Sequence, residues 1–236
     1  MSSKILFVVT NHDDLGGTGR TGWHSVEIGR PLQILRAAGL EVDFASPAGG
    51  RAPMSPYSEN YDDPINARFL FDQEVQAALA QTRAVSDLDA DQYRALYLVG
   101  GHGALWDFPD CEPLADLAVR VYEKGGLVAT IGQGAAGLLN ARLSNGKYLI
   151  EGKKITAFST EEERALKLDE VVPILLEDRL RERGAKFVQG ESWQPFVVTG
   201  ERLLSGQNPA SSQRLGEALG QALTEARTRR VAEAAH

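Results

Sequence analysis

Short apolar runs of strand length alternate with segments of helical character along most of the chain, and this alternation limits the fold more than any other feature. When helices connect the strands of a sheet, the strands run parallel and are buried on both faces, so they form nearly continuous apolar runs. We therefore expect an α/β fold of the flavodoxin-like type: a doubly wound, mostly parallel sheet with helices on both faces. The expected strands are residues 4–9, 41–46, 95–100, 127–132 and 154–158.

Helix ends, length and composition complete this outline. Residues 31–38 and 114–124 are expected to form helices, because glycine follows each segment and glycine often closes a helix. With 43% hydrophobic residues, the 236-residue chain can bury one substantial core but is short for two. We expect one domain over 1–228 and a frayed tail at 229–236. The last expected elements are short strands at 185–188, 196–199 and 201–204 and a closing helix at 212–228.

Charge and residue usage exclude several classes of protein. A net charge of −7 disfavours nucleic acid as a partner, because binding the phosphate backbone needs a basic surface. No apolar stretch is long enough to span a bilayer, and the N-terminus lacks the regions of a signal peptide. The single cysteine, Cys111, cannot form an intramolecular disulfide. We expect a cytoplasmic protein that acts on a small molecule and binds neither nucleic acid nor a membrane.

Residues 127–140 combine an apolar strand, a glycine-flanked turn and a helix, with Gly132 at the apex of the turn. Such a strand, turn and helix can hold a nucleophile above the edge of a sheet, where its side chain is exposed to substrate. The long loop at 47–66 is rich in Pro, Gly, Ser, Asn and Asp. Loops of this length in compact domains are usually functional, so we expect it to cover a pocket.

Four segments carry a resemblance to a known family: TGWHSVEIGRP (21–31), GGHGALWDFP (100–109), KLDEVVPILLEDRL (167–180) and GQNPASS (206–212). They resemble the ThiJ/PfpI family of the class I glutamine-amidotransferase-like superfamily, in the branch of heat-shock chaperones and glutathione-independent glyoxalases. The resemblance implies a homodimer and a nucleophilic cysteine at position 132. Where that branch has Cys-His-Gly-Pro, this chain has Gly132-Gln133-Gly134-Ala135. A positive φ at the apex costs about 1–3 kcal/mol for a residue with a Cβ, and glycine avoids most of that strain.

Glu27 matches the glutamate that lies beside the nucleophile in that family. A carboxyl group in an apolar pocket has a raised pKa and can act as a general acid or base near neutral pH. The alternative is an exposed glutamate paired with Arg30. His24 would share a helix face with Glu27 and could join it in acid–base catalysis, or it could fill an aromatic position as a partly buried side chain. Pro31 is expected to kink or restart that helix.

The resemblance also implies an oxyanion pocket bordered by Gly100, Gly101 and His102, with the backbone N–H of Gln133 as a further donor. Trp106, in the same motif, is placed in this substrate pocket. Aligning Phe158 puts the family's third catalytic residue at Glu163. The alternative is a helix start in which Thr160 is the N-cap and Glu163 closes a capping box. We favour the cap, because position 133 has no histidine for Glu163 to orient.

Three other sites have weaker support. Residues 132–137 match GxGxxG, but a dinucleotide fingerprint belongs to the first strand of its fold, and the downstream Glu151 is not at a strand end. Cys111 at the start of a helix could be a relocated nucleophile, although a lone cysteine is usually an inert small residue. His12, Asp13 and Asp14 offer ligand types without the further spacing of a metal site. We expect no metal and no cofactor.

These residues favour a cofactor-independent enzyme of the lyase, hydratase or isomerase type. Glu27, with His24, would transfer protons on a carbonyl-bearing or polycyclic molecule held over Gly132. The alternative is a non-catalytic chaperone or ligand-binding protein that has lost its activity. We expect no glyoxalase activity, because the glyoxalase route in related proteins needs a thiolate to form a hemithioacetal. Cysteine-protease activity is excluded for the same reason.

Overall fold

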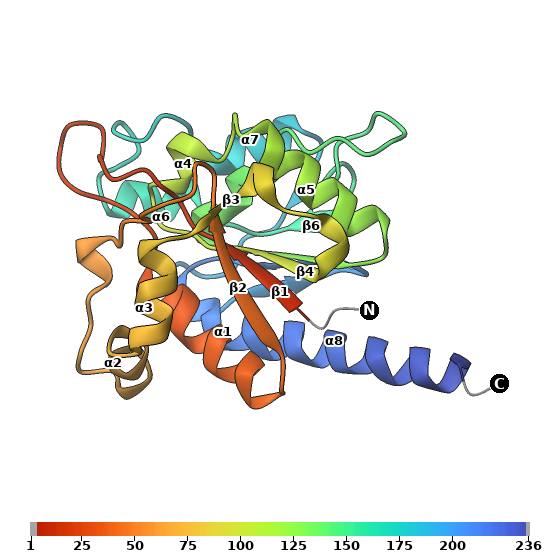
Figure 1. The fold of residues 1–236 in the computed structure, drawn as a ribbon. Coiled ribbons are helices and arrows are strands. Elements are labelled where there is room, and N and C mark those ends of the chain that lie inside the picture. Colours follow the sequence, from red (N-terminus) through yellow and green to blue (C-terminus); the bar gives the residue numbers. More distant parts are fainter. Residues whose placement is uncertain (1–3, 235–236) are drawn as a thin grey trace.

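A computed structural model describes residues 4–234 and contains a central seven-stranded sheet (Figure 1). The strand order is β3-β2-β1-β4-β5-β9-β8, and only β8 runs antiparallel to its neighbour. The expected α/β fold of the flavodoxin-like type is confirmed. The strands of this sheet are β1 (Lys4–Val8), β2 (Glu41–Ser46), β3 (Arg83–Ala84), β4 (Tyr93–Leu98), β5 (Leu127–Ile131), β8 (Val197–Thr199) and β9 (Leu203–Gly206).

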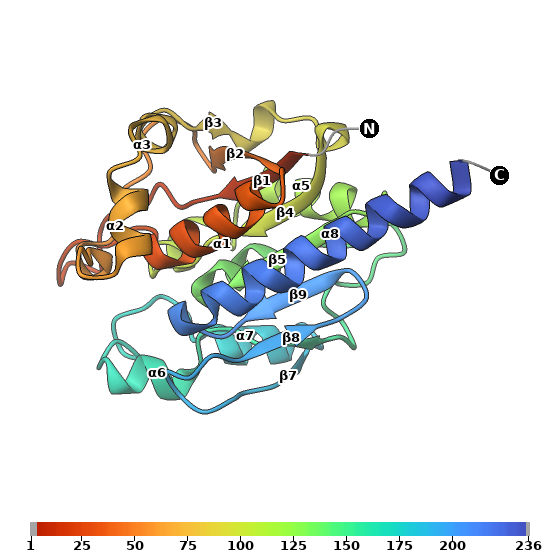
Figure 2. The same ribbon diagram turned by 90° about the horizontal axis from the view of Figure 1, so that it is seen from below.

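Helices cover both faces of the sheet, and α1 and α8 lie side by side across one of them (Figure 2). Helix α5 packs against the opposite face, together with α4 (Figure 1). Residues 132–138 form a 3₁₀ turn directly after β5. The helices are α1 (Ser25–Ala37), α2 (Pro64–Leu70), α3 (Gln73–Ala80), α4 (Ala104–Asp107), α5 (Glu112–Glu123), α6 (Thr160–Ala165), α7 (Leu176–Glu182) and α8 (Ser212–Ala234).

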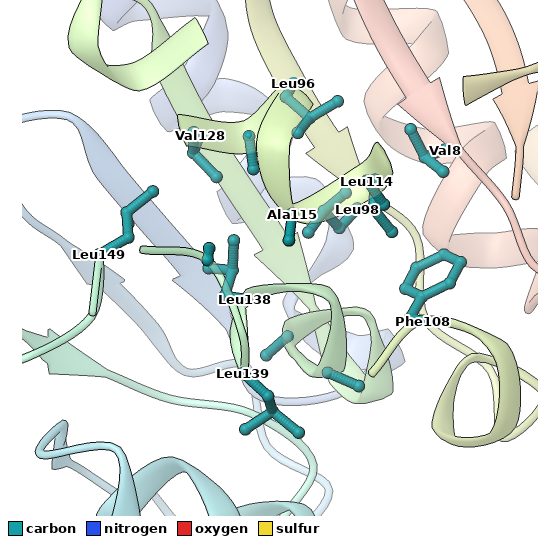
Figure 3. Packing of buried hydrophobic residues seen from close by; sticks show 14 of the residues in the cluster. Val8, Leu96, Leu98, Phe108, Leu114, Ala115, Val128, Leu138, Leu139 and Leu149 are labelled. Atoms are coloured by element: carbon teal, nitrogen blue, oxygen red, sulfur yellow. The ribbon is translucent and has the colours of Figure 1, made fainter. Parts of the chain in front are cut away.

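Alternating side chains of the strands build two separate cores. In β1, Leu6 and Val8 enter the core under α5, whereas Ile5 and Phe7 enter the core under α1 and α8. This follows from the period of two along a strand, which sends successive side chains to opposite faces. Figure 3 shows the first core, where strand residues meet the helix α5 and the turn after β5. The tight packing around this turn fixes the position of Gly132.

Helix α1 begins earlier than expected, at Ser25, and Pro31 lies inside it without ending it. Proline has no N–H to donate to the carbonyl four residues earlier, which here belongs to Glu27. The hydroxyl of Tyr97 in β4 donates to that carbonyl instead, at 3.0 Å. A strand side chain therefore replaces the missing helix bond, and the first turn of α1 stays in place beside the sheet.

Several elements differ from the outline drawn from the sequence. Residues 154–158 do not join the main sheet: β6 (Lys154–Ile155) pairs with β7 (Lys186–Phe187) in a separate two-stranded parallel sheet. The loop at 47–66 contains a 3₁₀ turn and the first residues of α2. The closing helix continues past 228 to Ala234, so the first part of the expected tail is helical, and 235–236 lie outside the described residues.

The carboxyl ends of β1, β4 and β5 meet at one edge of the sheet, where the strand order reverses between β1 and β4. Ligands of open α/β sheets bind in the crevice at such a switch point. The segments that follow these three strands lead to His24, to Gly100 and to Gly132. Within 4–234, no helix has the length and apolar character needed to cross a membrane.

Candidate active site

A pocket of about 410 Å³ opens at this edge of the sheet and brings together segments far apart in the sequence. Its buried part contains polar side chains, and its outer part contains mainly apolar ones. This volume lies within the usual range of small-molecule sites, about 300–1,000 Å³. The lining residues are Leu15, Thr21, His24, Glu27, Ser55, Tyr57, Gly101, His102, Gln133, Phe158, Leu166, Leu168, Trp193 and Pro209.

Gly132 follows the last residue of β5 and has a φ of +51°. This is the left-handed region, which favours glycine. A Cβ built on Gly132 would lie 3.0 Å from Oε1 of Glu27, so the apex of the turn faces that carboxyl group. The turn therefore has the geometry expected for an elbow, with a glutamate directly opposite its apex.

Glu27 lies in the first turn of α1 and is 1% exposed. Arg30 pairs with Asp63, so the alternative of an exposed Glu27–Arg30 pair is wrong. Burial raises the pKa of Glu27 to about 8, and a hydrogen bond from the backbone N–H of Gly100 opposes part of that shift. Its Oε2 is buried without a hydrogen-bond partner among the described residues. The carboxyl group is therefore mainly protonated at neutral pH and has one oxygen free for a ligand.

His24 is the N-cap residue of α1, and its side chain lines the same pocket as Glu27. The pKa of His24 is lowered to about 4, mainly by burial and also by the nearby His102. Its Nδ1 is buried and has no partner within the described part of the chain. The imidazole is therefore neutral at pH 7. The two side chains share the pocket, but no hydrogen bond joins them in residues 4–234.

The loss of folding stability at acid pH should depend on His24. Its folded pKa of about 4 is below its unfolded value of about 6.5, so stability is fully present above 6.5 and is lost as the pH falls toward 4. We expect His24→Phe to reduce the loss of unfolding free energy between pH 7 and pH 4.5, measured by urea denaturation. If His24→Phe loses as much unfolding free energy as wild type, another group is responsible for the loss of stability at acid pH.

Glu163 is hydrogen-bonded to two side chains that line the pocket. Its Oε2 lies 3.0 Å from Nε2 of His102, and its Oε1 accepts from Nε2 of Gln133 at 3.2 Å. The carbonyl oxygen of the Gln133 side chain in turn accepts from the backbone N–H of Gly101 at 3.3 Å. Because Gln133 and His102 both contact Glu163, the loop of β4 and the turn of β5 are held together by one carboxyl group.

The favoured interpretation of Glu163 as a capping residue is therefore wrong. The capping box of α6 is formed by Ser159 and Glu162, one residue earlier than expected. The reason against a role in the site was the missing histidine at position 133, but His102 supplies an imidazole from a different loop. Glu163 therefore stays the predicted third catalytic residue, now with an imidazole within hydrogen-bond distance.

Two of the expected oxyanion donors already have partners. The N–H of Gly100 donates to Glu27, and the N–H of Gly101 donates to the side-chain oxygen of Gln133. The second of these bonds is long, at 3.3 Å, and its acceptor belongs to a flexible side chain. A ligand carbonyl could replace that acceptor by displacing the amide of Gln133.

Two residues considered from the sequence lie outside the pocket. Trp106 does not line it, but stacks on His12 with ring centroids 4.9 Å apart. Cys111 caps α5 and packs against the first core, and burial raises the pKa of its thiol. A raised pKa disfavours the thiolate, so Cys111 is poorly suited to be a nucleophile. Within the described residues, no group of three or more His, Cys, Asp and Glu side chains gathers as metal ligands do.

Sequence reasoning missed much of the apolar wall. Phe158 was used only to align Glu163, and no motif in the sequence marks Trp193. In the structure Phe158 packs edge-on against both His102 and Trp193, with centroid distances of 5.7 Å and 5.6 Å. These residues come from separate loops, and no local pattern links them. The positive φ of Trp193, +64°, is visible only in the structure.

Residues 19–221 match the DJ-1/PfpI family. The chain belongs to the DJ-1/PfpI family. The glutathione-independent glyoxalase HSP31 of Saccharomyces cerevisiae is 31% identical over 223 residues, which cover 89% of this chain and 93% of that protein. Glyoxalase 3 of Candida albicans is 30% identical over 229 residues, 91% of this chain and 95% of the relative. The crystal structure of the Rapid Encystment Protein 24 KDa of Francisella tularensis has a TM-score of 0.90 and 32% identity, with 94% and 99% of the chains covered.

These relatives correct the expected function of this DJ-1/PfpI protein. Excluding a glyoxalase was wrong, because relatives about 30% identical over most of the chain are named glutathione-independent glyoxalases. The chemistry first favoured, a lyase, hydratase or isomerase explicitly distinct from a glyoxalase, is withdrawn. The exclusion rested only on the missing cysteine at position 132.

Proposed function

We propose that this chain is a glutathione-independent glyoxalase, which converts a 2-oxoaldehyde into the corresponding 2-hydroxy acid. One observation carries the proposal: the buried carboxyl group of Glu27 has a raised pKa, faces Gly132 and has an unpartnered oxygen in the pocket. A group of this kind can take and return a proton near neutral pH. The names of the relatives supply the reaction, and Glu27 supplies a residue able to perform its central step.

We further propose that Gly132 stands where the family's nucleophilic cysteine stands and that water replaces the thiol. The chain has one cysteine, Cys111, which does not line the pocket. Gly132 has no side chain that could add to the aldehyde, and in this proposal a water molecule beside Glu27 adds in its place. Water adds to the aldehyde carbon to give a hydrate, as a thiol would add to give a hemithioacetal.

From the hydrate, the reaction needs one proton to move from carbon to carbon and one to move between oxygen atoms. The carboxylate of Glu27 removes the hydrogen on the hydrated carbon, and the electron pair of that C–H bond forms a carbon–carbon double bond. The neighbouring ketone oxygen becomes an enolate oxygen. Glu27 then returns the proton to the carbon that carried the ketone. A hydroxyl proton of the hydrated carbon passes to the former ketone oxygen, and the hydrated carbon becomes the carboxylic acid. The oxygen of water is retained in the product, and no external oxidant or reductant takes part.

In this proposal, the remaining polar residues of the pocket form hydrogen bonds with the oxygen atoms of the substrate. The N–H of Gly101 donates to the ketone oxygen once the amide of Gln133 moves aside, and it stabilises the enolate. His102, held by Glu163 at 3.0 Å, lies where it can hydrogen-bond the hydroxyl groups of the hydrate. The neutral His24 adds an unpartnered Nδ1 to the same space. Each of these groups lines the pocket, and none depends on a thiol.

The test is turnover of methylglyoxal, followed as loss of the aldehyde and formation of lactate, by the wild-type chain and by Cys111→Ser. We expect both proteins to form lactate at rates equal within about twofold, because Cys111 packs against the first core away from the pocket. Absence of the 2-hydroxy acid with both substrates, lactate from methylglyoxal and mandelate from phenylglyoxal, would overturn the glyoxalase function. Loss of activity in a folded Cys111→Ser variant would instead overturn the thiol-free mechanism.

A further inference from the structure

Polarity is distributed across the pocket in an unusual order: the polar groups are buried and the apolar groups are exposed. Glu27 and Gln133 are almost fully buried, whereas Tyr57 is 78% exposed, Trp193 45% and Leu166 44%. Five large hydrophobic side chains are exposed in the part of the chain whose side chains are described, and these three line this pocket. Exposed apolar groups gathered at the mouth of a cavity indicate a ligand with an apolar part that covers them.

Trp193 is held at the pocket by a strained backbone. Its φ is +64°, a conformation that costs about 1–3 kcal/mol for a residue with a bulky side chain. The backbone N–H of Trp193 donates to Oε1 of Glu162 at 2.9 Å, and Nδ2 of Asn208 donates to the same oxygen at 2.7 Å. The other oxygen of Glu162 closes the capping box of α6. A buried carboxyl group thus fixes the strained residue, and strain of this kind is concentrated at functional sites.

A row of three rings connects Trp193 to the polar end of the pocket. Phe158 packs edge-on against Trp193 and against His102, with interplanar angles of 71° and 76°. His102 is hydrogen-bonded to Glu163 at the buried end. A ligand with its carbonyl groups near Glu27 and Gly101 would therefore extend an attached ring along Phe158 toward Trp193. Aromatic contacts of this type add about 0.5–1.5 kcal/mol beyond the burial of apolar area.

We propose that the pocket selects 2-oxoaldehydes with an aryl substituent over small ones such as methylglyoxal, and that Trp193 is the residue that determines this specificity. The proposal rests on the proposed function for its reaction, but the shape and polarity of the pocket carry the choice of substrate. The three-carbon methylglyoxal would leave the apolar outer half of a 410 Å³ pocket unfilled. The ring of phenylglyoxal would lie between Trp193 and Leu168.

Turnover gives the first test. We expect kcat/KM for phenylglyoxal to exceed that for methylglyoxal at least tenfold, and Trp193→Gly to reduce this ratio by about tenfold. Glycine accepts a φ of +64° without strain, so this variant removes the ring and keeps the turn. Tyr61→Ala is the control, because Tyr61 is an exposed aromatic residue that does not line the pocket. A wild-type ratio near one, or a ratio unchanged in Trp193→Gly, would overturn the proposal.

Binding of unreactive diketones separates this proposal from the proposed function. Titration calorimetry in borate-free buffer would compare 1-phenylpropane-1,2-dione with butane-2,3-dione, since neither carries the aldehyde that the reaction needs. We expect the phenyl compound to bind at least tenfold more tightly to wild type and to Tyr61→Ala, but not to Trp193→Gly. If the phenyl compound binds in this way but no oxoaldehyde is turned over, the aryl specificity of the pocket is supported and the glyoxalase function is rejected. Equal binding of the two diketones, with turnover of methylglyoxal, would reject the aryl specificity alone.

Discussion

Glu27→Gln should lower kcat/KM for the oxoaldehyde by at least about a thousandfold while leaving the fold intact. A positioned acid or base contributes about 10²–10⁴-fold to a rate, and in the proposed reaction Glu27 both removes and returns the proton. Glutamine has nearly the same shape and can still accept the hydrogen bond from Gly100, but it cannot take a proton from carbon. Steady-state kinetics with methylglyoxal and phenylglyoxal measure the effect.

The pH dependence of the wild type gives a second readout of the same group. The base form of Glu27 becomes populated as the pH rises toward its pKa of about 8, so kcat/KM should rise through this region and level off above it. The residual activity of Glu27→Gln should lack that rise. A variant that retains more than a tenth of the wild-type kcat/KM would contradict the assignment of Glu27 as the base.

The same substitution should stabilise the protein at alkaline pH. The folded pKa of Glu27 is about 8, above the unfolded value of about 4.5, so its contribution to stability is present below 4.5 and is lost as the pH rises to 8. A shift of this size corresponds to a few kcal/mol, in order of magnitude. We expect the free energy of unfolding of Glu27→Gln to exceed that of wild type at pH 8.5 and to approach it at pH 4.5. Glu182→Gln, at an exposed glutamate, should show no such difference.

The strands were predictable because each is a short apolar run that must be buried on two faces. The pattern placed β1, β2, β4 and β5 to within one or two residues. It failed for the beginning of α1, because proline is normally read as a helix boundary. The bond from Tyr97 to the carbonyl of Glu27, which makes Pro31 acceptable, joins residues 70 positions apart. No local pattern contains such a long-range contact.

The site was predictable where a motif fixes a backbone position, and less so where side chains meet across loops. Glu27, Gly101, His102 and Gln133 all border the pocket, as the motifs suggested. Glu163 was assigned to a helix cap because only its own segment and position 133 were considered. Its contact with His102 depends on how the loop after β4 folds over α6. Hydrogen bonds of this kind are set by tertiary packing, which the spacing of residues along the chain does not describe.

The exclusion of a glyoxalase failed for a chemical reason. A thiolate makes the aldehyde hydrogen acidic by forming a hemithioacetal, but water forms a hydrate whose carbon carries the same hydrogen. What the reaction requires in either route is a base at that carbon and a donor for the neighbouring oxygen. Glu27 has an unpartnered oxygen for the first task, and the N–H of Gly101 can perform the second once the amide of Gln133 moves aside. The nature of the nucleophile affects the rate, and it does not by itself decide whether the reaction can occur.

Introducing a thiol at the apex of the turn should therefore accelerate the reaction. In a Cys111→Ser background, we expect Gly132→Cys to raise kcat/KM for methylglyoxal at least about tenfold, because a thiol is a far stronger nucleophile than water. The new thiol would add to the aldehyde, Glu27 would move the same proton, and hydrolysis of the resulting thioester would release the 2-hydroxy acid and regenerate the thiol. The measurement is lactate formation, with alkylation by iodoacetamide to show that the thiol is responsible.

Gly132→Ala is the matched control, because it introduces the same strain and crowding without sulfur. Residue 132 has a φ of +51°, and a Cβ on it would lie 3.0 Å from Oε1 of Glu27. The side chain of Glu27 must therefore shift by a few tenths of an ångström in both variants. We expect Gly132→Ala to be several-fold slower than wild type, since its methyl group occupies space that the water needs. Equal rates in Gly132→Cys and Gly132→Ala would mean that position 132 is not placed for nucleophilic attack. A faster Gly132→Cys would mean that the site has kept the geometry for thiol chemistry while operating without it.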